Sequence, residues 1–170
     1  MQQYLRETVP SFEFLFLEKT RKYLIGTVGD MMIYCFRGTR TPDDFGVDVT
    51  AVPKPLLKGS VHKGFYERAK KVIDNHPIPN SINRVLFTGH SLGGAAAQCG
   101  YLITKLLHPS LSTVCVTLGC PCCVSSEIVS MVEEPREIVN FVNEGDYIPT
   151  ITVERFTSTS SSSSSLYIIV

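Results

Sequence analysis

Residues 87–98 read FTGHSLGGAAAQ, with an apolar run before them and an alanine-rich run after them. The run before is typical of a short buried strand, and the residues from Leu92 onward are typical of a helix. Gly89, Ser91 and Gly93 fit the pattern G-x-S-x-G, in which a serine occupies a sharp turn between a strand and a helix. The stretch therefore predicts that Ser91 is a nucleophile at the carboxyl edge of a sheet.

The glycines on either side of Ser91 have a physical role in this interpretation. A strand that turns at once into a helix strains the backbone of the serine, and side chains two residues to either side would collide. Gly89 and Gly93 leave the necessary room. The N-terminus of the helix then directs backbone N–H groups at the position where an oxyanion would form. The alternative interpretation is a glycine-rich turn without chemistry, because short patterns of this kind also occur by chance.

Around this turn the chain alternates between strand and helix patterns. Strands are predicted at 84–88, 112–119 and 137–143 and as a pair around a Gly-Asp turn within 23–39, helices at 64–76, 92–108 and 125–134, and a polar, proline-bearing loop at 41–59. Such alternation predicts an α/β fold, a mostly parallel sheet with helices on both faces.

The composition changes near the C-terminal end. Ser160–Ser165 is a run of serines, followed by LYIIV at 166–170. A polyserine run cannot bury enough surface to order itself. The predicted organisation is one α/β domain over 1–153, incomplete at its C-terminal end, and a Ser-rich disordered tail over 154–170.

Length, charge and composition limit the possible partners and locations. The 170 residues are 44% apolar and 19% charged with a formal net charge of zero, which suits one globular domain. The absence of a basic stripe with interleaved aromatic residues argues against nucleic acid as a partner. The first residues lack a signal-peptide pattern, and no window approaches the roughly 20 apolar residues of a membrane span. The expected location is the cytoplasm.

The cysteines are expected to be reduced. They are Cys35, Cys99, Cys115, Cys120, Cys122 and Cys123. Several lie in apolar runs, where a cysteine usually serves as a small buried hydrophobic residue. The cluster CPCC at 120–123 suggests a metal site as an alternative, but no paired Cys or His cluster at ligand spacing accompanies it. No metal and no cofactor are expected.

Five blocks of the chain, in the same order, resemble the class 3 (fungal-type) lipase family of the α/β-hydrolase fold. They are CFRGT at 35–39, VHKGFYERAKKV at 61–72, LFTGHSLGGAAA at 86–97, VTLGCP at 116–121 and VNFVNEGDYIPTI at 139–151. Together they are far more specific than any single motif. The resemblance implies an α/β-hydrolase fold over roughly residues 23–153.

Carried over by position, the resemblance implies Ser91 as nucleophile and Asp146 as the acid of a catalytic triad. It also implies an oxyanion hole made by Thr39, through backbone and hydroxyl, and by the backbone N–H of Leu92. His62, in the V-H-x-G-F block, is expected in the pocket wall. Asp146 follows an apolar strand, so its carboxylate is expected at the same sheet edge as Ser91. From the residues alone, turn-forming roles for Asp146 and Thr39 stay open.

The expected base of the triad is missing. In this fold the order is Ser, then Asp, then His, but His62, His76, His90 and His108 all precede Asp146. His90 is expected to point away from the serine hydroxyl, and His76 and His108 are expected at the surface. The simplest interpretation is a truncated product of a lipase gene.

The function implied by the resemblance is hydrolysis of lipid carboxylic esters, most simply acylglycerols, at a membrane or lipid-droplet surface. One alternative is a catalytically inactive lipase-like module used for binding or signalling. Another is an esterase or acyltransferase that acts on other substrates, because a fold alone does not define a substrate. The segment 41–60 corresponds to the lid position and is predicted as either a short apolar lid or a solvated loop.

Overall fold

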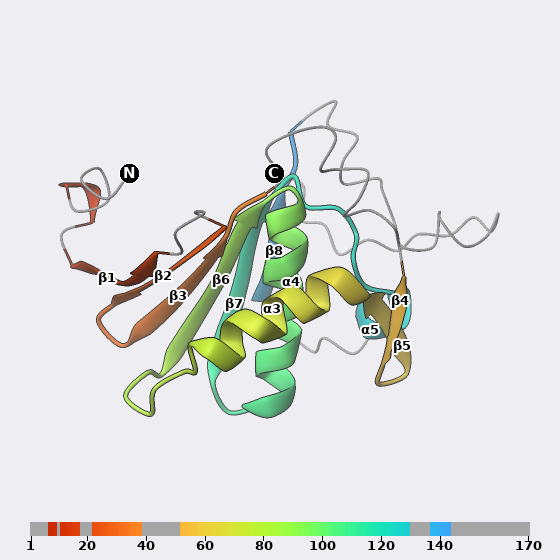
Figure 1. Ribbon diagram of the computed structural model, residues 1–170, viewed down its shortest axis with the longest axis horizontal. Coiled ribbons are helices and arrows are strands. Elements are labelled where there is room, and N and C mark those ends of the chain that lie inside the picture. The colour runs from red at the N-terminus through yellow and green to blue at the C-terminus, as the bar shows by residue number, and fades with distance from the viewer. Residues whose placement is uncertain (1–6, 10, 18–21, 39–51, 130–136, 144–170) are drawn as a thin grey trace.

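One mixed sheet organises the computed structural model, whose described residues are 7–9, 11–17, 22–38, 52–129 and 137–143 (Figure 1). Its strands, in spatial order, are β1 (Phe12–Leu17), β2 (Tyr23–Val28), β3 (Met31–Phe36), β6 (Arg84–His90), β7 (Ser112–Leu118) and β8 (Ile138–Phe141). The pairings β1–β2 and β2–β3 are antiparallel, whereas β3–β6, β6–β7 and β7–β8 are parallel. The mostly parallel α/β sheet predicted from the sequence is therefore confirmed.

The two long helices pack on the same face of this sheet. They are α3 (Lys63–Asn75) and α4 (Leu92–Leu107), and Figure 1 shows both in front of the strands. The buried residues of α3 recur at helical spacing, as the sequence indicated: Phe65, Ala69, Val72 and Ile73. A short helix, α5 (Ser126–Val129), forms the first part of the helix predicted at 125–134. Residues 130–136 lie outside the described part.

The core lies between the sheet and these helices. Tyr34 of β3 and Phe87 of β6 are fully buried register neighbours, and their rings stack with centroids 5.0 Å apart. The Tyr34 hydroxyl donates a hydrogen bond of 2.5 Å to the carbonyl of His76, just after α3. Burial raises the pKa of Tyr34, so the phenol stays a donor at physiological pH. This bond links the end of α3 to the centre of the sheet.

Small side chains let α4 approach the sheet closely. Its first thirteen residues, Leu92–Thr104, are all buried, including Ala95, Ala96 and Ala97. At Gly100 an added Cβ would lie 2.6 Å from Cε1 of Phe87, so the aromatic ring occupies the space that a side chain would need. The glycine and alanine residues of this helix therefore set how near it lies to β6.

Two elements differ from the sequence prediction. Residues 53–56 of the predicted loop form β4 (Pro53–Leu56), so the loop prediction was wrong there. This strand pairs with β5 (Gly59–His62) in a hairpin beside the main sheet. Leu56 packs against the core, and Leu57 at the turn is 58% exposed. Strand β1 was not predicted. Its residues, FEFLFL, are almost all apolar, and such a short apolar run does not distinguish a strand from a helix. Its register against β2 shifts between Phe14 and Phe16.

The six cysteines form no disulfide, and burial keeps the thiols of several of them protonated. Cys99, Cys115, Cys120 and Cys123 are at most 1% exposed. Burial raises the pKa of the Cys115 and Cys120 thiols, which disfavours the thiolate that a metal would require. Within the described residues no cluster of ligand side chains could hold a metal ion.

None of the described helices is long and apolar enough to cross a membrane.

The contact between Gly100 and Phe87 can be tested by a double-mutant cycle. Gly→Ala inside a helix normally stabilises by about 1 kcal/mol, but Gly100→Ala is expected to destabilise because its methyl group would collide with the Phe87 ring. In a Phe87→Leu background the collision is removed, so the same change should be neutral or stabilising. Urea unfolding of the four proteins measures the coupling. Equal effects of Gly100→Ala in both backgrounds would contradict the proposed contact.

Candidate active site

Ser91 occupies a one-residue turn between β6 and α4. Strand β6 ends at His90 and α4 begins at Leu92, so the strand and helix that the motif requires are both present. Ser91 has φ 53° and ψ −129°, a conformation that a residue with a side chain rarely adopts. Only Leu57 shares a positive φ among the non-glycine residues described. Such strain persists only where the surroundings impose it, and it is typical of functional positions.

Backbone hydrogen bonds hold both sides of the Ser91 peptide. Its N–H donates to the carbonyl of Leu118, at the end of β7, with an N–O distance of 2.9 Å. Its carbonyl accepts from the N–H of Gly94 at 2.8 Å and of Ala95 at 3.3 Å, in the first turn of α4. Ser91 is partly exposed. The residue is therefore held by its backbone while its side chain stays partly accessible.

The glycines of the motif lie at close backbone contacts. A Cβ added to Gly89 would lie 2.5 Å from the backbone carbon of Gly93. A Cβ added to Gly93 would collide with the carbonyl oxygen of Phe36 and lie 2.6 Å from the carbonyl carbon of Arg37. Because these neighbours are backbone atoms, they cannot turn aside as a flexible side chain can. The first turn of α4 is thus pressed against the ends of both β6 and β3.

The end of β3 brings the chain beside Ser91 at the predicted oxyanion position. A Cβ added to Gly38 would lie 2.6 Å from the His90 carbonyl oxygen and 3.4 Å from Cβ of Ser91. Arg68 of α3 donates to the Arg37 carbonyl at 2.7 Å, which anchors this strand end from the helix side. Thr39, the next residue after Gly38, lies outside the described residues.

The other predicted oxyanion donor, Leu92, is the first residue of α4 and is 1% exposed. The first N–H groups of a helix have no partner within the helix and carry the positive end of its dipole. An oxyanion formed at Ser91 would lie at this end of α4. The role of the Leu92 backbone as an oxyanion donor stays a prediction.

The predicted acid Asp146 lies outside the described residues. Strand β8 ends at Phe141, five residues before it, and pairs parallel with β7. The carboxyl ends of parallel strands meet at one edge of a sheet. The chain therefore leaves β8 at the edge where Ser91 lies, which is compatible with the predicted role.

The four histidines have different surroundings, and the predicted place of His62 in the pocket wall stays a prediction. His62 is 6% exposed and its ring lies 4.3 Å from that of Phe65, in the core near the start of α3. His76 packs its ring at 4.4 Å from Phe16, where burial lowers the pKa of the imidazole. His108 follows the sixteen-residue α4, a helix of about 24 Å at 1.5 Å per residue. The fourth, His90, precedes Ser91 directly and is exposed.

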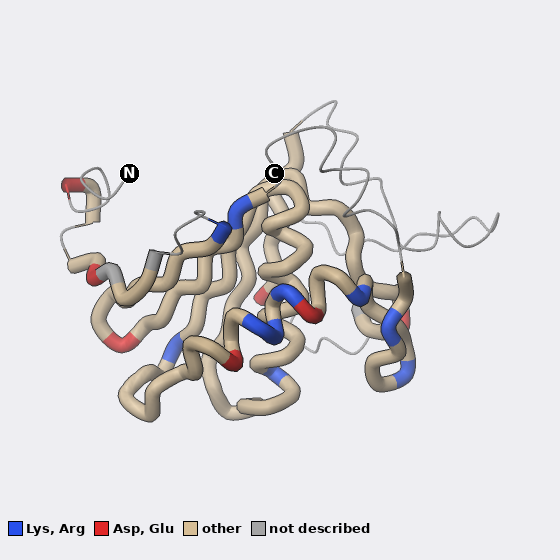
Figure 2. Tube along the Cα trace, viewed as in Figure 1, with Lys and Arg blue, Asp and Glu red and all other residues tan. Residues whose placement is uncertain are grey.

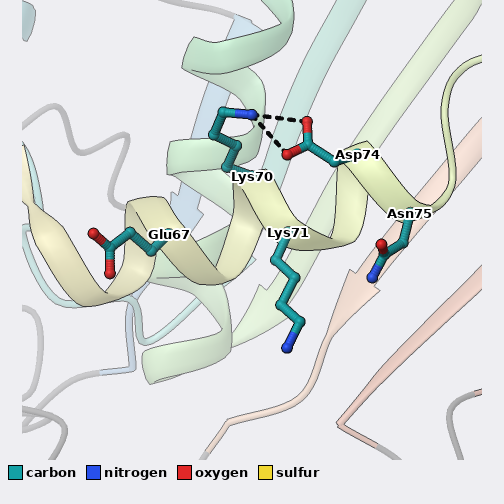
Figure 3. A pocket seen from close by; sticks show the side chains of 5 residues that line it. All are labelled: Glu67, Lys70, Lys71, Asp74 and Asn75. Carbon is teal, nitrogen blue, oxygen red and sulfur yellow. Dashed lines mark hydrogen bonds and ion pairs between the residues drawn. The ribbon is translucent and has the colours of Figure 1, made fainter.

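A surface hollow on α3 does not belong to this site. It is lined by Glu67, Lys70, Lys71, Asp74 and Asn75 (Figure 3). Charges of both signs lie along this helix (Figure 2). The ammonium of Lys70 pairs with the Asp74 carboxylate one turn away at 2.6 Å (Figure 3). Exposed pairs of this kind contribute little to stability. The hollow is a solvated helix surface without a nucleophile.

Sequence reasoning missed the buried network beside the turn. Asn140 of β8 is fully buried, and its carboxamide binds the backbone of Cys120 and the hydroxyl of Thr117. An available signal was a single asparagine within the otherwise apolar strand run IVNF at 138–141. A polar side chain in such a run needs hydrogen-bond partners when it is buried.

Close packing at Gly93 predicts the effect of adding one methyl group there. Gly93→Ala is expected to destabilise by about 1–3 kcal/mol and, in the gene product expressed with its natural downstream sequence, to reduce strongly the rate at which a fluorophosphonate, a reagent for activated serines, labels Ser91. Gly100→Ala is the matched control, because it adds the same methyl group to the same helix away from the turn. The control should lose stability without losing labelling. Equal labelling of folded Gly93→Ala and wild type would contradict the packing described for the turn.

Comparison with known proteins places this architecture in a family. The model of the family "Lipase (class 3)" matches residues 33–156. Among solved structures, the chain is similar to the triacylglyceride lipase of Rhizomucor miehei, with 24% identity, a TM-score of 0.62, and coverage of 84% of this chain and 62% of that one. A lipase from Yarrowia lipolytica gives 21% identity, a TM-score of 0.61, and coverage of 85% and 64%.

A further similar structure is a triacylglycerol lipase whose catalytic centre is described as a serine protease triad. It has 23% identity and a TM-score of 0.67, with coverage of 88% of this chain and 64% of that one. The chain thus spans less than two thirds of the length of these lipases. The comparison with curated proteins found no match. The structural likenesses show the fold, and because the family model covers most of the chain, the chain belongs to the class 3 lipase family.

Proposed function

We propose that this protein is a serine hydrolase that cleaves carboxylic esters of lipids, with Ser91 as the nucleophile. The observation that carries the proposal is the strained backbone of Ser91 between β6 and α4, with the N-terminus of α4 beside it. Membership of a lipase family supports a lipid ester as the substrate class. Acylglycerols are the simplest members of that class, and we propose them as the substrates.

The proposed reaction proceeds through an acyl-enzyme. Ser91 Oγ attacks the ester carbonyl carbon while its proton passes to a general base. The N–H of Leu92, together with Thr39, stabilises the negative oxygen of the tetrahedral intermediate; loss of one such donor typically costs about 10²–10³ in rate. The bond to the alcohol then breaks, and the base returns the proton to the leaving oxygen. Water attacks the acyl-enzyme by the same steps, which releases the fatty acid and restores the hydroxyl.

The general base is the part of this proposal that the 170 residues do not supply. Asp146 is proposed to orient a histidine, which follows the acid in the chain order of this fold. No histidine follows His108 in the sequence. We propose that the base comes from polypeptide that continues beyond these residues in the gene product. The greater length of the similar lipases supports this proposal.

The missing base is also the observation that favours a second function. Without a histidine, the same scaffold would be a catalytically inactive lipase-like module that binds a lipid or a protein. Its distinguishing property would be an intact fold without an activated serine. The proposed cytoplasmic location and the association with a membrane or lipid-droplet surface apply to both functions. Fractionation of cells that express the tagged protein tests them.

Variants of Ser91 and Asp146 distinguish these functions in the gene product expressed with its natural downstream sequence. Ser91→Ala is expected to abolish fluorophosphonate labelling and to lower kcat on dioleoylglycerol by about 10⁶-fold, and Asp146→Asn by about 10⁴-fold. Ser112→Ala, which changes an exposed serine at the start of β7, is the control and should leave both unchanged.

The length of the chain provides the second comparison. Labelling of the longer protein but not of the 170 residues alone would place the base downstream. If neither protein is labelled, the hydrolase function is wrong and the inactive binding module remains. If Ser91→Ala retains activity, another residue is the nucleophile. Comparison of dioleoylglycerol vesicles with a water-soluble short-chain ester tests the proposed lipid substrate class.

A further inference from the structure

The carboxamide of Asn140 is hydrogen-bonded at both ends to the turn that follows β7. Its Oδ1 accepts from the hydroxyl of Thr117 at 3.0 Å and from the backbone N–H of Cys120 at 3.1 Å. Its Nδ2 donates to the backbone carbonyl of Cys120 at 3.1 Å. Asn140 and Thr117 are both fully buried. One side chain from β8 thus binds the donor and the acceptor of a single residue in the neighbouring segment.

The segment held by Asn140 is the one that contacts Ser91. Residues 118–120, hereafter the β7 turn, change direction at Gly119, which has φ 54°. The Leu118 carbonyl of this turn accepts the hydrogen bond from the Ser91 N–H at 2.9 Å. On the other side of the same turn, Cys120 lies so near α4 that a Cβ added to Gly94 would be 2.8 Å from the Cys120 Cβ. The β7 turn therefore borders the Ser91 turn at both its N–H and its helix.

Burial makes the Asn140 bonds decisive for the position of the β7 turn. Cys120 is fully buried, so its N–H and carbonyl have no water to replace a lost partner. The backbone bond from the Gly119 N–H to the Phe141 carbonyl, 2.8 Å, is a further connection between the turn and β8. If the carboxamide is removed, the two groups of Cys120 must find other partners. The turn can provide them only by moving, and the Leu118 carbonyl moves with it.

We propose that Asn140 is a positioning residue for Ser91. Its carboxamide holds the β7 turn, and through the Leu118 carbonyl it holds the Ser91 N–H and the strained backbone of the nucleophile. Asn140 does not touch the substrate in this role. Its effect on catalysis rests on the proposed function, whereas its effect on the Ser91 backbone does not depend on that function.

The first test replaces the carboxamide by an apolar group of similar size. In Asn140→Leu, hydrogen exchange of the Ser91 amide, measured by NMR on the folded protein, is expected to speed up at least about tenfold because its acceptor is no longer held. In the gene product expressed with its natural downstream sequence, the kcat for lipid ester hydrolysis is expected to fall about 10- to 100-fold with KM little changed, because misplacement of a reacting group lowers the chemical step. The maximal rate of fluorophosphonate labelling should fall in parallel.

Thr113→Val is the matched control. Thr113 is a fully buried residue of β7 on the same face as Thr117, and its hydroxyl donates to the Leu111 carbonyl at the opposite end of the strand. This variant also removes a buried polar group, so a loss of stability is expected in both proteins. Only Asn140→Leu should change the exchange of the Ser91 amide and kcat. Equal changes in both variants would mean that Asn140 has a merely structural role, and would overturn the proposal.

Asn140→Asp provides a rescue that depends on pH. A buried carboxyl group has a raised pKa. Below that pKa its protonated oxygen can donate to the Cys120 carbonyl while the other oxygen accepts from the Cys120 N–H, as the carboxamide does. Above it, the carboxylate faces the carbonyl oxygen without a proton between them. The activity of the variant relative to wild type at the same pH should therefore be near one at low pH and fall as pH rises. A ratio that does not change with pH would contradict the proposed bonding.

The two readouts separate failure of this inference from failure of the proposed function. If the wild-type gene product with its natural downstream sequence neither hydrolyses lipid esters nor labels at Ser91, the proposed function fails, but a faster Ser91 amide exchange in Asn140→Leu would still support the positioning contact. If wild type is active and Asn140→Leu matches it in kcat and in amide exchange, the positioning role is wrong while the function stands.

Discussion

The close contact between the first turn of α4 and the ends of β3 and β6 is the constraint on which the rest of the structure depends. Gly93 lies against the backbone of Phe36 and Arg37, and Gly89 lies against Gly93. At these separations no side chain fits on either glycine. The chain can pass from strand to helix in this space only if one residue takes a left-handed φ, and Ser91 is that residue. The geometry of the candidate nucleophile is thus a consequence of helix-to-sheet packing.

This packing also explains why so much of α4 consists of small residues. Alanine and glycine fill its first turns, and the helix lies near enough to β6 for Phe87 to occupy the space at Gly100. Larger residues return toward the far end, where Leu106 and Leu107 are exposed. A close-packed interior transmits displacement, so a shift of this helix would reach the Ser91 turn directly. The stability of the core and the geometry of the site are therefore linked.

The candidate site draws support from four neighbouring strands at one edge of the sheet. β3 provides the chain before Thr39, β6 carries Ser91, β7 ends at the Leu118 carbonyl, and β8 carries Asn140. Arg68 adds a bond from α3 to the end of β3. Parallel strands bring these ends together although they are distant in sequence. The antiparallel strands β1 and β2 lie on the opposite side of β3, and the carbonyl of Lys22, just before β2, accepts a hydrogen bond from the Arg37 N–H at 2.9 Å.

Much of the fold was predictable because its signals are local. The strand before Ser91, the helix after it, the Gly-Asp turn at 29–30 and the amphipathic helix α3 each follow from residue spacing, and the structure confirms them. The hairpin β4–β5 was not predictable in the same way, because its prolines and lysines resemble those of a loop. Strand β1 was missed because its short, almost wholly apolar run FEFLFL does not distinguish a strand from a helix. The predicted roles of Thr39, Asp146 and the 154–170 tail concern residues outside the described part and stay predictions.

By itself the sequence determined the order of the two long helices and the parallel strands, the place of Ser91 between a strand and a helix, and the need for glycine on either side. These follow from short-range sterics and hydrophobic periodicity, which depend only on residues that are neighbours in the sequence. Only the tertiary structure decided which partners hold the nucleophile: the Leu118 carbonyl at its N–H, the backbone of β3 against Gly93, and the buried carboxamide of Asn140 behind the β7 turn. Those contacts join residues that are close only after the strands have paired. Their identity depends on strand order and register, which no local pattern specifies.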